Sequence, residues 1–292
     1  MTENKTDINE NLYSRQLYVL GHDTMRKMAD SNILIVGLGG LGVETAKNII
    51  LTGVKSVTIY DNTICSMRDL SSQFYLTKDD VGVKTRAEAS LKHLDELNQY
   101  VTVNLYQGDL NKEFLEQFTV AVFTDQVSLN ELMALNETCR SVNCKFVLAE
   151  QSGIYGFVFV DNGPEHIVTD TNGEQPTSNL ISSIEAGNPT KITVDESNRL
   201  ELDNDDLITF IEVADDSTSS TEAKKSLSLL NELPPQKIKV TGPYTLEVDL
   251  DTTEFSKHQL GSGYINQVKP NRQMKFLSLK ESLDYPEFLI TD

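Results

Sequence analysis

The feature that most constrains the fold is a short apolar run that ends in a cluster of glycines. Residues 32–42 read Asn-Ile-Leu-Ile-Val-Gly-Leu-Gly-Gly-Leu-Gly, and residues 43–51 continue with the apolar spacing of a helix. The four apolar residues from Ile33 to Val36 predict a strand that is buried on both faces. A strand that turns through glycines into a helix presents free backbone N–H groups to a phosphate. The turn therefore predicts a nucleotide-binding loop built on Gly37, Gly39 and Gly42. The alternative, that these glycines only allow the helix to pack closely on the sheet, stays open.

The residues up to 148 continue this alternation of strands and helices. Further strands are expected at 56–60, 101–106, 120–124 and 145–148, and further helices at 84–97, 110–118 and 129–139. Such alternation predicts parallel strands with helices on both faces of the sheet. The fold class is therefore α/β, a Rossmann-like doubly wound, mainly parallel sheet.

The pattern changes after Asp161, where short alternating strands and turn signals take over. A chain of 292 residues is long enough for about two domains. We expect the first domain to comprise residues 1–165 and 266–292, and a small all-β domain of residues 166–265 to be inserted in it. Within the insert, residues 215–225 are polar and are expected to be flexible.

The two ends of the chain also carry signals. Residues 1–8 are expected to be a disordered leader, and residues 12–28 to form short helices around a break at Gly21. Apolar residues after Met274 predict a helix that packs back on the first domain. The chain then stops without a helix cap or a tail, so we expect it to be part of a longer protein.

The charge of the chain limits its partners. The sequence has 25 Lys and Arg against 44 Asp and Glu, a net charge of −19, and residues 161–256 hold 20 of the acids and only six bases. An acidic surface repels phosphate backbones and anionic lipids, so neither a nucleic acid nor a membrane is expected as a partner. No apolar run approaches the length of a membrane span, and no signal-peptide pattern is present. We therefore expect a cytoplasmic and nuclear protein, and the acidic insert suggests a basic partner.

Asp61 and the three cysteines indicate which ligand chemistry to expect and which to exclude. Asp61 follows the second strand, 19 residues beyond Gly42, where an acid can bond ribose hydroxyls. The three cysteines cannot form a disulfide framework, and their spacing does not fit a zinc site or a catalytic Cys–His pair. We expect no metal site and a structural role for Cys65, Cys139 and Cys144.

Several runs together resemble one family, the eukaryotic ubiquitin-activating (E1) enzymes. They are the glycine loop and residues 11–21 (Asn-Leu-Tyr-Ser-Arg-Gln-Leu-Tyr-Val-Leu-Gly), 69–76, 79–82 and 94–98. The resemblance covers nearly the whole chain and implies the inactive adenylation domain of such an enzyme, interrupted by the first half of its catalytic cysteine domain. It further implies that the full-length enzyme uses ATP and Mg²⁺ to adenylate ubiquitin, forms a thioester and passes ubiquitin to E2 conjugating enzymes.

The chain departs from the family's active nucleotide pattern in ways that affect phosphate binding. Active domains of this type carry Asp-x-Asp-x-x-x-x-Ser-Asn-x-Asn-Arg-Gln-Phe after the second strand. Here the pattern keeps Asp61, but Asp69 replaces an Asn and Ser72 replaces the phosphate-binding Arg. Asp125 matches the family's Mg²⁺-binding Asp, and Arg86 can only partly compensate. We therefore predict a degenerate nucleotide pocket, formed by the glycine loop, Asp61 and Asp125, that is catalytically silent and requires no cofactor of its own.

Arg15 is the residue that the resemblance singles out. In the family, the Arg of the Ser-Arg-Gln run contacts ATP in the partner adenylation domain, so it acts in trans as an arginine finger. From spacing alone, Arg15 would be an ordinary surface residue near a helix start. The resemblance also predicts three partners, which are the active adenylation domain of the same enzyme, ubiquitin and, through the full-length enzyme, the E2 conjugating enzymes.

Three other functions are compatible with parts of this pattern. The smaller subunit of a SUMO- or NEDD8-activating heterodimer would share the same motifs. An NAD-dependent oxidoreductase could use the glycine loop and Asp61, and a bacterial-type adenylyltransferase would need a phosphate-binding Arg at the position of Ser72. The long match favours a ubiquitin-activating enzyme over the heterodimer subunit, no candidate proton donor supports the oxidoreductase, and Ser72 speaks against the adenylyltransferase.

Overall fold

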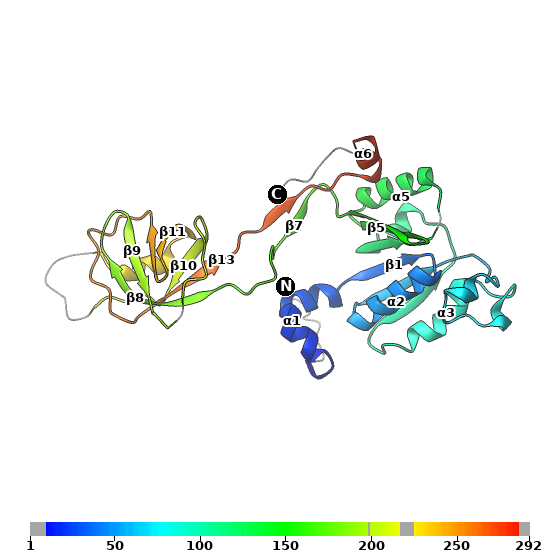
Figure 1. The fold of residues 1–292 in the computed structure, drawn as a ribbon, viewed down its shortest axis with the longest axis horizontal. Helices are drawn as coiled ribbons and strands as arrows, with labels where there is room; N and C mark the ends of the chain where they lie inside the picture. Colours follow the sequence, from blue (N-terminus) through cyan, green and yellow to red (C-terminus); the bar gives the residue numbers. More distant parts are fainter. Residues whose placement is uncertain (1–9, 126, 198, 217–224, 286–292) are drawn as a thin grey trace. The chain divides into compact units, whose positions relative to one another are not determined.

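The computed structural model describes residues 10–125, 127–197, 199–216 and 225–285. The chain divides into two compact units (Figure 1). The first contains the residues up to His166 together with those from Met274, and the second contains Ile167–Gln273. The expected leader (1–8), most of the expected flexible segment (215–225) and the last seven residues lie outside the described residues.

The first unit is built on a six-stranded sheet whose order is β3-β2-β1-β4-β5-β6. Its strands are β1 (Asn32–Val36), β2 (Ser56–Tyr60), β3 (Thr102–Tyr106), β4 (Val120–Phe123), β5 (Lys145–Ser152) and β6 (Tyr155–Asp161). The first five strands are parallel, and β6 pairs with β5 in the antiparallel sense. The predicted α/β class with a mainly parallel sheet is confirmed.

Helices cover both faces of this sheet, as Figure 1 shows. Ile33 and Ile35 of β1 pack with α2 (Gly40–Thr52) and α3 (Arg86–Asp95) on one face. Leu34 and Val36 point the other way, into a core shared with helices α4 (Lys112–Leu115), α5 (Leu129–Ser141) and α6 (Leu279–Asp284). The central strand is therefore buried on both sides, which is why its sequence is a continuous apolar run.

The chain enters the first unit through α1 (Glu10–Ala29), which is interrupted at Gly21 by a positive φ of 76°. The Tyr13 hydroxyl accepts a hydrogen bond from the Asn98 side chain at 3.0 Å, and Met25 is buried. Among the described residues, none of the helices is both long enough and apolar enough to cross a membrane.

The second unit is a small closed barrel of antiparallel strands in the order β10-β11-β12-β9-β8-β13. An apolar core fills it, with Ile181, Ile192, Ile208 and Leu246 fully buried. The all-β insert predicted from the sequence is confirmed. The barrel strands are β8 (Ser178–Glu185), β9 (Thr190–Val194), β10 (Leu207–Ile211), β11 (Gln236–Gly242), β12 (Thr245–Val248) and β13 (Tyr264–Val268), and the short strands β7 (His166–Val168) and β14 (Arg272–Met274) pair with each other.

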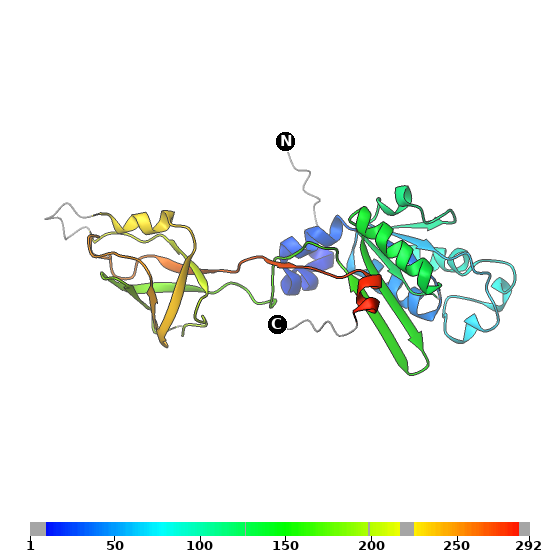
Figure 2. The same cartoon turned by 90° about the horizontal axis from the view of Figure 1, so that it is seen from above.

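The hairpin β5–β6 differs from the sequence prediction. β5 continues four residues past the expected end at Leu148 and turns at Gly153 (φ 60°) into β6, for which no strand was predicted. Figure 2 shows this hairpin extending from the sheet. Residues 157–160 (Phe-Val-Phe-Val) are all apolar, so the apolar–polar alternation that identifies a half-buried strand in a sequence is absent, and the hairpin exposes Ile154, Tyr155 and Val158.

Candidate functional site

The glycine loop, Asp61 and Asp125 meet at the carboxyl edge of the parallel strands. This edge lies beside the point between β1 and β4 where the strand order reverses, which is where ligands bind in open α/β sheets. A cavity of about 440 Å³ opens there, a size in the range of small-molecule sites. It is lined by Val36, Gly37, Tyr60, Asp61, Asn62, Thr63, Leu110, Asp125, Val127, Ser128, Glu131 and Leu135.

Two of the glycines are required by close packing. A Cβ on Gly42 would lie 1.9 Å from the carbonyl oxygen of Gly37, and a Cβ on Gly37, whose φ is 93°, would lie 2.5 Å from the Cβ of Asp125. Gly39 has more room, because its nearest neighbour would be the Arg86 side chain at 3.5 Å. The packing role that the sequence left as an alternative is therefore present at Gly37 and Gly42.

The chain itself covers the start of α2. A Cβ on Gly40 would lie 2.9 Å from both the Cβ and the carbonyl oxygen of Ser72, which follows a short 3₁₀ turn at Asp69–Ser71. The first turn of α2 has no acidic residue and no side-chain cap. The helix end that would attract a phosphate thus faces backbone and a small hydroxyl side chain.

Both carboxylate oxygens of Asp61 are used within the protein. Oδ2 accepts a hydrogen bond from the Leu38 backbone N–H at 2.7 Å, and Oδ1 accepts one from Thr63 N–H at 2.9 Å. Asp61 Oδ2 also lies 2.7 Å from Nε of Arg86, and the residue is only 4% exposed. The geometry therefore shows Asp61 holding the glycine loop and a buried cation.

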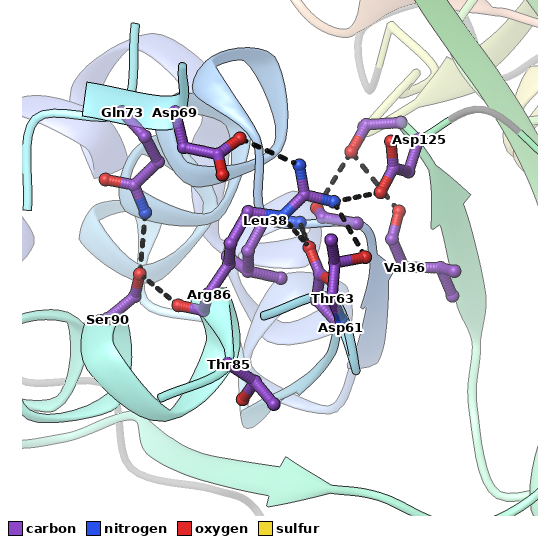
Figure 3. A network of polar contacts seen from close by, with 12 residues as sticks. Val36, Leu38, Asp61, Thr63, Asp69, Gln73, Thr85, Arg86, Ser90 and Asp125 are labelled. Atoms are coloured by element: carbon purple, nitrogen blue, oxygen red, sulfur yellow. Dashed lines mark hydrogen bonds and ion pairs between the residues drawn. The ribbon is translucent and has the colours of Figure 1, made fainter. Parts of the chain in front are cut away.

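Arg86 is buried beside the cavity, and its guanidinium lies between three carboxylates, of which Asp61 and Asp125 also line the cavity (Figure 3). Its Nε faces Asp61, Nη1 lies 3.5 Å from Asp69, and Nη2 contacts Asp125. Nη2 also donates to the Thr63 hydroxyl at 3.3 Å. Burial alone would lower the pKa of Arg86, but the three carboxylates outweigh it and the pKa is raised. Arg86 therefore stays charged.

Asp69 is also held as a carboxylate. Burial raises its pKa, but hydrogen bonds from the Ser66 hydroxyl (2.7 Å) and N–H (2.8 Å), together with the Arg86 charge, lower it further than burial raises it. The site thus places three acidic side chains around one guanidinium.

Arg15 lies apart from this cluster. It sits on the exposed part of α1, and within the described residues it forms neither a hydrogen bond nor an ion pair. Of the residues predicted from the sequence, the structure brings together the glycine loop, Asp61 and Asp125, and no contact found among the described residues joins Arg15 to them.

Sequence reasoning gave Arg86 only a compensating role and missed its central position. One local signal was available. Thr85 caps α3 through a capping box with Glu88, so Arg86 is the first residue of the helix. A cation is unfavourable at the positive end of a helix, and its presence there indicates that nearby acids stabilise it.

The three cysteines lie in the interior. Cys65, Cys139 and Cys144 are all buried and free, and burial raises the pKa of Cys65. Among the described residues there is no group of three His, Cys, Asp or Glu side chains that could hold a metal ion.

Comparison with known proteins identifies the family. Residues 13–235 match the ThiF family model, and the chain belongs to the ThiF family. It is 44% identical over 99% of its length to a ubiquitin-like modifier-activating enzyme 1 of Oryctolagus cuniculus and 40% identical, again over 99%, to that of Dictyostelium discoideum. A ubiquitin-activating enzyme of Triticum aestivum is 40% identical over 98% of the chain. The resemblance read from the sequence is therefore confirmed.

These relatives are much longer than this chain, which spans about a quarter of their length (26–27%). Among solved structures, a crystal structure of Escherichia coli MccB with succinimide is similar, with a TM-score of 0.44 and 22% identity over 52% of this chain and 49% of that one.

Proposed function

We propose that this chain is the inactive adenylation part of a ubiquitin-activating enzyme, a scaffold that pairs with an active adenylation domain elsewhere in the same protein. The observation that carries the proposal is the poor fit between the candidate pocket and Mg-ATP. Asp61, Asp69 and Asp125 repel a triphosphate, and they already neutralise the cation that lies among them, Arg86. Ser72 also covers the start of α2.

In this proposal the whole enzyme performs the chemistry that the family is known for. It adenylates the carboxyl terminus of ubiquitin with Mg-ATP, forms a thioester on a cysteine outside this chain and passes ubiquitin to a conjugating enzyme. The likeness to ubiquitin-like modifier-activating enzymes over 99% of the chain supports this assignment. The barrel would supply a contact surface for ubiquitin.

An apolar surface supports the pairing with a second domain. The β5–β6 hairpin exposes Ile154 (93%), Tyr155 (76%) and Val158 (66%), and α1 exposes Tyr18 (92%) and Val19 (73%). Exposed apolar side chains that are close in sequence, as in the hairpin and in α1, are typical of protein interaction sites. We propose that the active adenylation domain covers them.

Arg15 would then act across this interface. Its exposed side chain has no partner among the described residues, so it is available to a ligand outside this unit. A guanidinium brought to the phosphates of ATP from a neighbouring domain stabilises the charge that develops there. We propose this role for Arg15 in the full-length enzyme.

The test uses the full-length enzyme and measures ubiquitin thioester formation at several ATP concentrations. Arg15→Ala should raise the KM for ATP by about tenfold or more, because a charged contact to phosphate is lost. Arg26→Ala is the matched control, since Arg26 lies on the same helix and already pairs with Asp23. Unchanged kinetics of Arg15→Ala at limiting ATP would remove this role.

A further inference from the structure

The Arg86 guanidinium forms ion pairs with three acidic side chains that are buried or partly buried. Its side chain is 9% exposed, against 2% for Asp61, 17% for Asp69 and 34% for Asp125. Each carboxylate faces a different guanidinium nitrogen, so the acids surround the cation (Figure 3). Three carboxylates around one point can hold a cation, and here that cation is the side chain of Arg86.

The surroundings of Arg86 favour its own guanidinium as the cation of this site. A buried carboxylate needs a cation or several donors nearby, and removing the cation leaves an uncompensated charge. The guanidinium meets that need, yet the four groups together still carry more acids than bases. An incoming phosphate therefore meets a negative site, and an incoming metal ion meets a site whose acids are already paired.

We propose that Arg86 is the built-in cation of this site, and that its ion pairs with Asp61, Asp69 and Asp125 keep both nucleotide phosphates and divalent cations from binding there. This deepens the proposed function, since it says what makes the pocket silent. This exclusion depends on a balance of charge, so shifting the balance in either direction should allow a ligand of the opposite sign to bind.

The first arm of the test removes the cation from the 292-residue chain. Arg86→Met keeps most of the side-chain length and removes the guanidinium that neutralises the three acids. Asp69 and Asp125 are partly exposed and can move toward a metal ion, which carboxylates bind through oxygen. We expect Mn²⁺ at saturation to raise the melting temperature of this variant by about 5 °C or more, and to leave the wild type unchanged.

The matched control is Arg140→Met. Arg140 is a second semi-buried arginine of the same unit, but among the described residues its only ion pair is with one carboxylate, Asp161, at 2.7 Å. Its loss also breaks a buried ion pair, yet one carboxylate makes a poor metal site. Mn²⁺ should therefore not restore the melting temperature of Arg140→Met, and a rescue equal to that of Arg86→Met would overturn the proposal.

The second arm leaves Arg86 in place and removes acids, which guards against a failure of Arg86→Met to fold. In the double variant Asp69→Asn, Asp125→Asn, the guanidinium keeps only Asp61 as a charged partner. Inorganic pyrophosphate should then stabilise the variant and not the wild type. Absence of a pyrophosphate response here, or stabilisation of the wild type by Mn²⁺ or pyrophosphate, contradicts the proposal. Stabilisation of the wild type would also count against the proposed silent pocket, whereas a missing response of either variant overturns only the role of Arg86 and leaves the proposals on Arg15 and ubiquitin unaffected.

Discussion

The carbonyl oxygen of Gly37 occupies the place where a side chain on Gly42 would begin, 1.9 Å from the position of its Cβ. This contact brings the end of β1 against the start of α2. Gly42→Ala must move backbone to relieve the overlap, which outweighs the better helix propensity of alanine. We predict a loss of about 2 kcal/mol or more in the free energy of unfolding, measured with urea.

Gly39→Ala provides the comparison within the same loop. Its Cβ would meet only the far end of the Arg86 side chain, at 3.5 Å. We expect a change of less than about 0.5 kcal/mol. Equal losses in the two variants would mean that the loop glycines are not distinguished by packing.

The sequence predicted the parts of this unit that follow from local pattern. The apolar run Ile33–Val36 and the glycines identified the strand-to-helix turn, and the structure places Asp61 beside that turn. The pattern could not decide what the glycines are for, because both roles require the same residue type. Only the distance from Gly42 to Gly37 shows the packing requirement.

A second buried ion pair in this unit joins α5 to the end of β6. Arg140 of α5 lies 2.7 Å from both oxygens of Asp161 at the end of β6 and points toward the carbonyl oxygen of Phe276, which precedes α6. Asn136 also donates to Asp161, at 2.8 Å. Arg140→Ala should cost about 3–5 kcal/mol of unfolding free energy, because Asp161 stays buried without its cation.

The companion variant Asn136→Ala should cost less, since Arg140 remains to neutralise Asp161. Removal of a neutral hydrogen-bond partner in a buried site typically costs about 1–3 kcal/mol. If Arg140→Ala were the milder of the two in urea unfolding, the pair would not be held by charge.

The barrel contains a histidine that should make its stability depend on pH. His258 is 7% exposed, its Nε2 donates to the Ser262 carbonyl oxygen at 2.8 Å, and its Nδ1 is buried with no partner in the part of the chain that the structure describes. Burial lowers the pKa of His258 from 6.5, more than the bond to Ser262 raises it. The folded barrel therefore favours the neutral ring.

The unfolded chain binds a proton on His258 more readily than the folded barrel does. The stabilisation from this residue is therefore fully present above pH 6.5 and is lost as the pH falls through the lowered pKa of the folded state. We predict that His258→Gln shows a smaller loss of stability between pH 7 and pH 5 than the wild type, in thermal melts of both proteins. Identical pH profiles would show that His258 does not contribute.

What the sequence could not supply are contacts between distant segments. Arg86 is 25 residues from Asp61 and 39 from Asp125, and no local pattern says that these three side chains meet. The β6 strand was missed for a different reason, because Tyr155 and Val158 are exposed in this unit and do not follow the pattern of a half-buried strand. The first feature depends on tertiary structure, and the second on a strand whose apolar side chains are exposed in this unit.

The charge of the inserted barrel leads to the last prediction, which rests on the proposed contact with ubiquitin. Residues 161–256 carry 20 acids and six bases. An acidic surface attracts a basic partner and speeds its association, and dissolved salt weakens this attraction. We expect the association rate of ubiquitin with the full-length enzyme to fall by about tenfold between 50 and 500 mM NaCl, with a smaller change in the dissociation rate. A charge-reduced variant, Glu201→Gln with Asp203→Asn and Asp205→Asn, should lessen the salt dependence, since these residues are exposed and lie before β10. Stopped-flow measurement of both rates tests this, and an association rate that is indifferent to salt would show that the acidic barrel does not steer ubiquitin.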